Sequence, residues 1–207
     1  RGAMELFRKG GYDASTLPEL QAAMGTISPP SFYAAFGSKE KVFADAADLY
    51  RNEVACGAAA AIEGGVTAKA SIEGLMRESL KMFTDSPERP GCMFLLGAVN
   101  STNAAAEEML REKRREALDM MRKRIRRGIK DGDVPKTADV DGIAAFYTAV
   151  LQGIAFSARD RVPSGDRDRG CDCAAPRGSR GRCRARAPTI RRPSTCPYRP
   201  RSRARAC

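Results

Sequence analysis

The chain contains no histidine and no tryptophan among its 207 residues. Without histidine it lacks the side chain that most often serves as a general base. A phosphate-binding glycine loop, the nucleophile-elbow pattern of serine hydrolases and paired metal-ligand motifs are also missing. Cys56 and Cys92 each stand alone in apolar segments, which is typical of small buried residues. We therefore expect no enzyme: no catalytic residue, no metal site and no cofactor.

Long apolar runs are also lacking, since none approaches the roughly 18 residues that cross a bilayer. No signal peptide precedes the first predicted helix, so we expect a cytoplasmic protein with no membrane partner. The formal net charge of +11 suggests a nucleic-acid binder. Residues 157–207 carry 15 arginines, 4 aspartates and neither lysine nor glutamate, which accounts for the whole +11. The first 156 residues are neutral overall.

The segment from Thr16 to Phe43 has the pattern of two short helices with a turn at Gly25, and a third helix that begins at Ser38. The apolar residues that share a face are Leu17, Leu20 and Met24 in the first helix, and Phe32 and Phe36 in the second. Two short helices with narrow apolar stripes suit a helix-turn-helix, in which the second helix enters the DNA major groove. Periodicity alone is equally consistent with another kind of helical hairpin.

The same segment resembles the DNA-binding domain of the TetR family of transcriptional regulators. The matching positions are Gly25, Ile27, Ser28, Phe32, Tyr33, Phe36, Lys39, Glu40 and Phe43, preceded by Gly10 to Tyr12, Ser15 and Thr16. The similarity covers residues 1–50 and continues weakly to about residue 160. One departure is an additional residue, because Thr26 and Ile27 both lie between the turn glycine and the serine where the family usually has one residue.

Local chemistry agrees with a DNA-reading role for this segment. Thr16 and Ser28 are predicted N-caps, and the two prolines after Ser28 suit helix positions where a missing N–H costs little. Backbone donors at such helix starts can hold phosphate oxygens. The resemblance implies phosphate contacts from Tyr33 and Lys39. The predicted DNA-contacting residues are Thr16, Ser28, Pro29, Pro30, Ser31, Tyr33 and Lys39.

A helical body is predicted to follow. Helices are expected over residues 38–62, 67–86, 103–131 and 139–159, with a buried helix in the apolar stretch 91–101. Small residues recur in the last helix and permit close helix packing; they are Gly142, Ala145, Ala149 and Gly153. The resemblance implies a homodimer built by the last two long helices. Ordinary packing within one chain is the alternative.

The resemblance also implies a ligand pocket in the body. Methionine and aromatic side chains are candidates for its lining, although the same residues also suit an ordinary core. The main candidates are Phe83, Phe94, Met109, Met121, Phe146, Tyr147 and Gln152, and three further ones are Met82, Leu95 and Met120. Because the apolar segments carry few charges, we expect a small and mainly apolar effector.

The last segment differs in composition from the rest. Residues 162–207 hold half of the chain's 12 prolines and five of its seven cysteines, and show no helical or alternating periodicity. Such a sequence cannot assemble a core. It is either an arginine-rich arm that adds salt-sensitive DNA affinity or the product of a frameshift near Arg161. The absence of lysine favours the frameshift.

The sequence thus predicts an all-α protein. A helix-turn-helix domain is expected over residues 1–48, a helical regulatory and dimerisation domain over 49–160, and a disordered arginine-rich tail over 161–207. The predicted function is a ligand-responsive regulator that binds a palindromic double-stranded operator DNA as a homodimer and represses transcription until a small-molecule effector releases it. The alternative is a helical interaction module or a degenerate regulator with only non-specific nucleic-acid binding through the tail.

Overall fold

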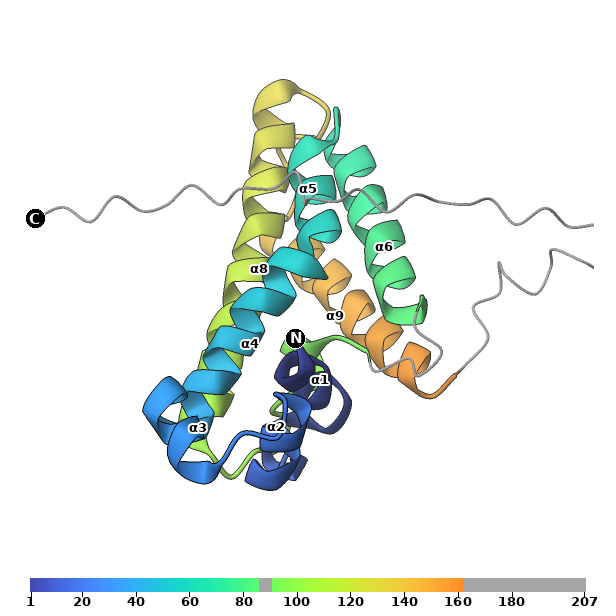
Figure 1. Cartoon of the computed structure of the whole chain (residues 1–207). Coiled ribbons are helices and arrows are strands. Elements are labelled where there is room, and N and C mark those ends of the chain that lie inside the picture. The colour runs from blue at the N-terminus through green and yellow to red at the C-terminus, as the bar shows by residue number, and fades with distance from the viewer. Residues whose placement is uncertain (86–90, 162–207) are drawn as a thin grey trace, which may run out of the picture.

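The computed structural model describes residues 1–85 and 91–161, and every regular element within these ranges is a helix. Three short helices form a head at one end of the molecule (Figure 1). They are α1 (Gly2–Ala14), α2 (Leu17–Ala23) and α3 (Pro29–Phe36). Phe7, Leu20 and Phe32 are completely buried in the core that these helices share with α4. The predicted tail lies outside the described residues beyond Arg161.

Helix α1 bends at Gly11, and the bend brings the head against the body. Gly11 has a φ of 77°, and a Cβ at this position would lie 2.9 Å from the carbonyl oxygen of Gly97. The next residue, Tyr12, donates its backbone N–H to that carbonyl over 2.7 Å. Glycine is required here because both the left-handed backbone and the close approach exclude a side chain.

The helix expected over residues 38–62 is two helices, α4 (Lys39–Glu53) and α5 (Cys56–Gly64). The prediction of one continuous helix was therefore wrong. The backbone N–H of Ala55 donates to the carbonyl of Tyr50, five residues earlier, at 3.0 Å, which widens the last turn of α4. After the break, α5 packs along α6. The two residues between the helices, Val54 and Ala55, are neither proline nor glycine, but Gly57 in the first turn of α5 allows close packing on α6, where a Cβ would lie 3.1 Å from a Glu78 carboxylate oxygen.

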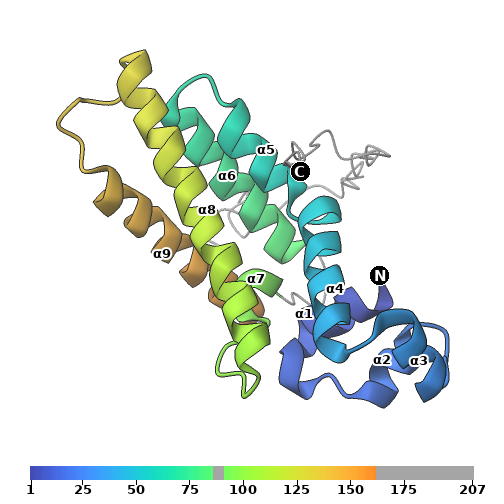
Figure 2. The same ribbon diagram turned by 90° about the vertical axis from the view of Figure 1, so that its left-hand side faces the viewer.

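The body also contains α6 (Ala68–Thr84), α7 (Met93–Leu96), α8 (Ala104–Asp131) and α9 (Val140–Arg159). Figure 2 shows α8 running the length of the body, with α9 on one side and α5 and α6 on the other. A second buried cluster, separate from the head core, lies between these helices; it contains Ile62, Ile72, Met121, Ile125 and Ala144.

The helix expected over 91–101 shrinks to the four residues of α7, so that prediction was too long. The Gly97 carbonyl accepts from Tyr12 of the head and leaves the helical pattern. Asn100 then adopts a φ of 58°, a left-handed conformation that stops any continuation. The Cys92 side chain before α7 is buried, as predicted.

Candidate nucleic-acid interface

The start of α3 is exposed and is capped by hydroxyl groups. Ser28 accepts from the backbone N–H of Ser31 at 3.3 Å, and the two hydroxyl oxygens lie 2.9 Å apart. Pro29 and Pro30 occupy the first helical positions, as predicted. Because the prolines have no N–H and the Ser31 amide is engaged, this helix start presents hydroxyls to a partner. The expected cradle of free backbone amides is not formed here.

Alternation of buried and exposed aromatic rings orients α3. Phe32 is completely buried, while the adjacent Tyr33 is 52% exposed and meets the Phe32 ring edge-on at 5.5 Å between centroids. Phe36 packs on the same side as Phe32, with ring centroids 5.6 Å apart. The two phenylalanines therefore anchor the helix, and the Tyr33 phenol and the serine hydroxyls lie on its free face.

The additional residue in the turn is absorbed by the backbone. Gly25 has a φ of 98° and Thr26 a φ of 59°, so two successive residues are left-handed. The amides of Thr26 and Ile27 both donate to the carbonyl of Gln21, at 2.8 and 3.4 Å. A β-branched residue in this conformation is strained. The extra residue therefore tightens the turn and leaves the start of α3 exposed.

The predicted cap of α2 forms, and α4 has a cap of the same kind. Thr16 and Glu19 make a reciprocal capping box at the start of α2, in which the Thr16 N–H donates to the Glu19 carboxylate at 2.8 Å. That bond lowers the pKa of the exposed Glu19 carboxyl. Ser38 caps α4 by accepting from the Lys41 N–H at 3.2 Å. Thr16 is exposed, but its hydroxyl already serves the box through a bond to Glu19.

Lys39 is only partly free. Its Nζ lies 4.3 Å from the ring centroid of Tyr12, a cation–π distance. The Tyr12 hydroxyl in turn donates to the Glu40 carboxylate at 2.8 Å. This bond is the main reason why the pKa of Glu40 falls to about 2. Lys39 thus lies beside Tyr12, where the head meets the body.

Asn103 joins that same cluster from the body, a role that periodicity did not reveal. Its Oδ1 accepts from the Ala106 N–H at 2.9 Å, which makes Asn103 the N-cap of α8. Its Nδ2 donates to Glu40 at 2.9 Å and to the Tyr12 hydroxyl at 3.2 Å. Arg8 makes a second connection of this kind, donating to the carbonyls of Gly91 and Met82 at 3.2 and 3.1 Å. The head is therefore attached to the body by directional polar bonds.

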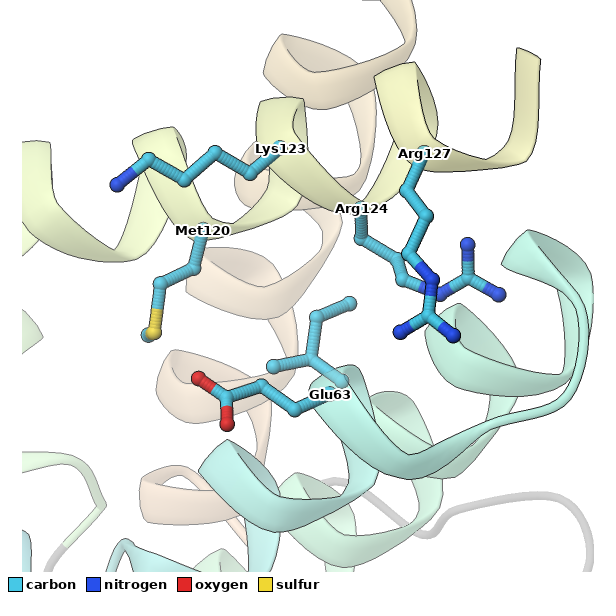
Figure 3. Close-up of a pocket in the computed structure, with 6 residues that line it drawn as sticks. Glu63, Met120, Lys123, Arg124 and Arg127 are labelled. Carbon is cyan, nitrogen blue, oxygen red and sulfur yellow. The ribbon is translucent and has the colours of Figure 1, made fainter. Parts of the chain in front are cut away.

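The predicted ligand-lining residues do not converge on one cavity. Phe83 is buried in the head core, with Phe94 and Met109 packed against that core. Met121 and Tyr147 belong to the second cluster. Phe146 is 62% exposed on α9 and Gln152 is partly exposed. Their role in ligand binding stays a prediction. A cavity between α5 and α8 is lined by one of the further candidates, Met120 (Figure 3).

Cys92, one of the two isolated cysteines, is buried. Burial raises the pKa of the Cys92 thiol, which keeps it protonated and a poor nucleophile at neutral pH.

One helix of the described residues, α9, is long and apolar enough to cross a bilayer on length and composition alone. The sequence statement that no segment approaches this length was therefore too strict. In the single chain the buried residues of α9 are Ala144, Ala155 and Ala158, and the others are partly or fully exposed.

Comparison with known proteins identifies the class of protein that this head defines. The family model described as "Bacterial regulatory proteins, tetR family" matches residues 1–46, and "Tetracyclin repressor-like, C-terminal domain" matches residues 68–161. The chain belongs to the TetR family of DNA-binding transcriptional regulators, as the sequence resemblance predicted.

Individual relatives agree with this assignment. A cysteine mutant of the TetR family transcriptional regulator CifR, complexed with 26bp double-strand operator DNA, is 39% identical with a TM-score of 0.73, covering 78% of this chain and 85% of that chain. A putative TetR transcriptional regulator from Rhodococcus sp. RHA1 is 30% identical with a TM-score of 0.54, covering 78% and 87%. The HTH-type transcriptional repressor ComR of Escherichia coli (strain K12) is 26% identical over 164 residues, 76% of each chain.

Proposed function

We propose that this regulator is a repressor that binds a palindromic operator as a homodimer through the α3 face and leaves the DNA when a small effector binds the body. The observation that carries the proposal is the exposed set of Ser28, Ser31 and Tyr33 on a helix anchored by the buried Phe32. The operator complex of the similar CifR chain supports it. Action on DNA also implies a cytoplasmic protein.

A homodimer is favoured by the surface of α9. The four small residues predicted to form a packing stripe are all exposed: Gly142, Ala145, Ala149 and Gly153. Phe146 and Phe156 lie on the same helix and are 62% and 49% exposed. A Cβ at Gly153 would meet nothing within 4 Å. An apolar helix with this much free surface is covered most simply by the same helix of a second copy, in a symmetric interface.

The dimer explains how two short α3 helices gain an adequate footprint. Two heads related by a twofold axis read half-sites about one or more turns of DNA apart. Release then follows when an effector favours a conformation in which the spacing of the heads no longer fits successive major grooves.

The test is a gel-shift titration with DNA that flanks the chain's own gene. Tyr33→Phe removes the exposed hydroxyl while leaving the ring contact with Phe32, and we expect operator affinity to fall about 3- to 10-fold, the loss typical of one phosphate hydrogen bond. Ser31→Ala should act similarly. Lys136→Ala, at an exposed site in the body, is the matched control and should bind as the parent does.

Unchanged affinity in both Tyr33→Phe and Ser31→Ala would reject the α3 face as the docking surface. Circular dichroism of each variant must show full helical content, so that a loss of binding cannot come from unfolding.

A further inference from the structure

The outward face of α3 carries small side chains along its middle. At about 100° per residue, Pro30 and Ala34 lie on the side of the helix opposite the buried Phe32. Ser31 and Tyr33 lie about 100° from Phe32, one on either side, and all four of these residues are exposed. In Figure 2, α3 lies at the end of the head, away from α9. A DNA groove that receives this helix therefore meets Pro30 and Ala34 first.

The hydrogen-bonding groups of α3 distinguish base pairs poorly. Its eight residues, PPSFYAAF, include no charged and no amide side chain. Those are the side chains that make the specific hydrogen bonds to guanine, adenine and cytosine in the major groove. Serine hydroxyls bond to more than one base, and the hydroxyl oxygens of Ser28 and Ser31 also engage each other at 2.9 Å. Base discrimination by this helix therefore needs another kind of contact.

The apolar surface of α3 supplies such a contact. The methyl group of thymine is the apolar group that base edges present in the major groove, and small apolar side chains contact it. Pro30 and Ala34 are four residues apart and so lie next to each other along the helix. Their side chains are short, so they reach a base edge only when the helix backbone lies deep in the groove, and they have no bulk that holds it out. The two residues form an apolar ridge that fits thymine methyl groups.

We propose that α3 recognises thymine, with Pro30 and Ala34 in contact with thymine methyl groups in each operator half-site. The proposal deepens the proposed function and rests on it, because it concerns the same face of α3 on the same DNA. The hydroxyls of Tyr33 and the serines then set the register of the helix through phosphates. Burial of one methyl group contributes about fourfold in affinity, and one in each of two half-sites about 15-fold.

Replacement of thymine by deoxyuridine tests the readout, because it removes the methyl groups and keeps every base pair. The probe is the DNA that flanks the chain's own gene, amplified with either thymidine or deoxyuridine triphosphate. In gel-shift titrations of the full chain, we expect the deoxyuridine form to bind about 15-fold or more weakly. A random-sequence fragment of the same length, made in both forms, controls for altered DNA flexibility and should bind equally weakly in both.

Synthetic duplexes separate the methyl group from the hydrogen-bonding group at each thymine that the chain protects from DNase I. 5-Methylcytosine paired with guanine keeps the methyl group but replaces the O4 acceptor of thymine by an amino donor. At a contacted position we expect thymine to bind about fourfold more tightly than deoxyuridine, and 5-methylcytosine about fourfold more tightly than cytosine. Equal affinities within both pairs at every protected position would overturn the methyl readout.

Substitutions in α3 assign the contact to the ridge. Ala34→Gly removes its methyl group, and we expect the ratio of thymine to deoxyuridine affinity to fall about threefold or more. Ala35→Gly is the matched control, because this exposed residue lies off the ridge and the substitution costs the same helix propensity. Partial unfolding of a variant weakens binding to both DNAs alike and leaves the ratio unchanged. A parental ratio in both Ala34→Gly and Pro30→Ala, or an equal fall in Ala35→Gly, would overturn the assignment.

The outcomes separate this proposal from the proposed function. A parent chain that binds no operator rejects the proposed function and the methyl readout with it. Operator binding that is equal for the thymine and deoxyuridine fragments overturns the methyl readout alone.

Discussion

Asn103 offers a sharp test of how the head is attached to the body, because substitutions can separate its two tasks. Its Oδ1 caps α8 through Ala106, and its Nδ2 donates to Glu40 and Tyr12. Asn103→Ser retains a capping hydroxyl but has no second donor of similar reach. Asn103→Ala removes both functions.

The expected magnitudes follow from these contacts. A hydrogen bond to an ionised carboxylate in a partly buried site contributes about 1–2 kcal/mol, so Asn103→Ser should lower the free energy of unfolding by that amount. Loss of the cap adds about 1 kcal/mol in Asn103→Ala. Asn103→Asp keeps the cap but places a second carboxylate beside Glu40, and should therefore be less stable than Asn103→Ser at pH 7.

Urea unfolding followed by circular dichroism measures these differences. A double-mutant cycle with Glu40→Gln isolates the bond between the two side chains, and we expect the pair of substitutions to be less damaging than the sum of the single ones. Asn103→Ser with parental stability, or a cycle that is additive within about 0.3 kcal/mol, would refute the reasoning that this bond attaches the head.

Two further predictions concern the pH dependence of stability and the dimer. The pKa of Glu40 is about 2 in the folded chain, below its ordinary value of 4.5, so the ionised carboxylate stabilises the fold above about pH 4.5 and this contribution is lost as the pH falls toward 2. Urea midpoints measured from pH 6 to 3 should therefore fall less steeply in Glu40→Gln, and equal slopes would contradict the prediction. Ala149→Glu places a charge in the exposed small-residue stripe of α9 and should convert the dimer to a monomer in sedimentation-velocity runs. Ala70→Glu, on the exposed surface of α6, should remain dimeric, and a dimer in both variants would exclude α9 as the interface.

Local sequence rules were sufficient for much of the fold. Ser28, Thr67 and Asn103 each accept the backbone N–H of the third residue that follows, as N-caps do. The separation of buried Phe32 from exposed Tyr33 follows from helical spacing. These features depend on residues within one or two turns of each other, and for that reason the sequence predicted the Ser28 cap, the two faces of α3 and the helix-turn-helix.

Contacts between distant residues decided the remainder. The break after Glu53 exists because α5 packs along α6, and α7 is short because the Gly97 carbonyl bonds to Tyr12, 85 residues away in the head. The ligand-lining predictions scattered over two clusters because apolar periodicity marks a buried face without saying which core it joins. Nothing in the sequence separates Arg124 from the other cations of α8, and the structure alone shows that it is buried beneath the turn at Gly65 with one nitrogen unpaired within the described part of the chain. Caps and helix faces depend on residues close together in the sequence, so the sequence alone determines them. The burial of a charge and the partners it finds depend on which helices pack together, so only the tertiary structure decides them.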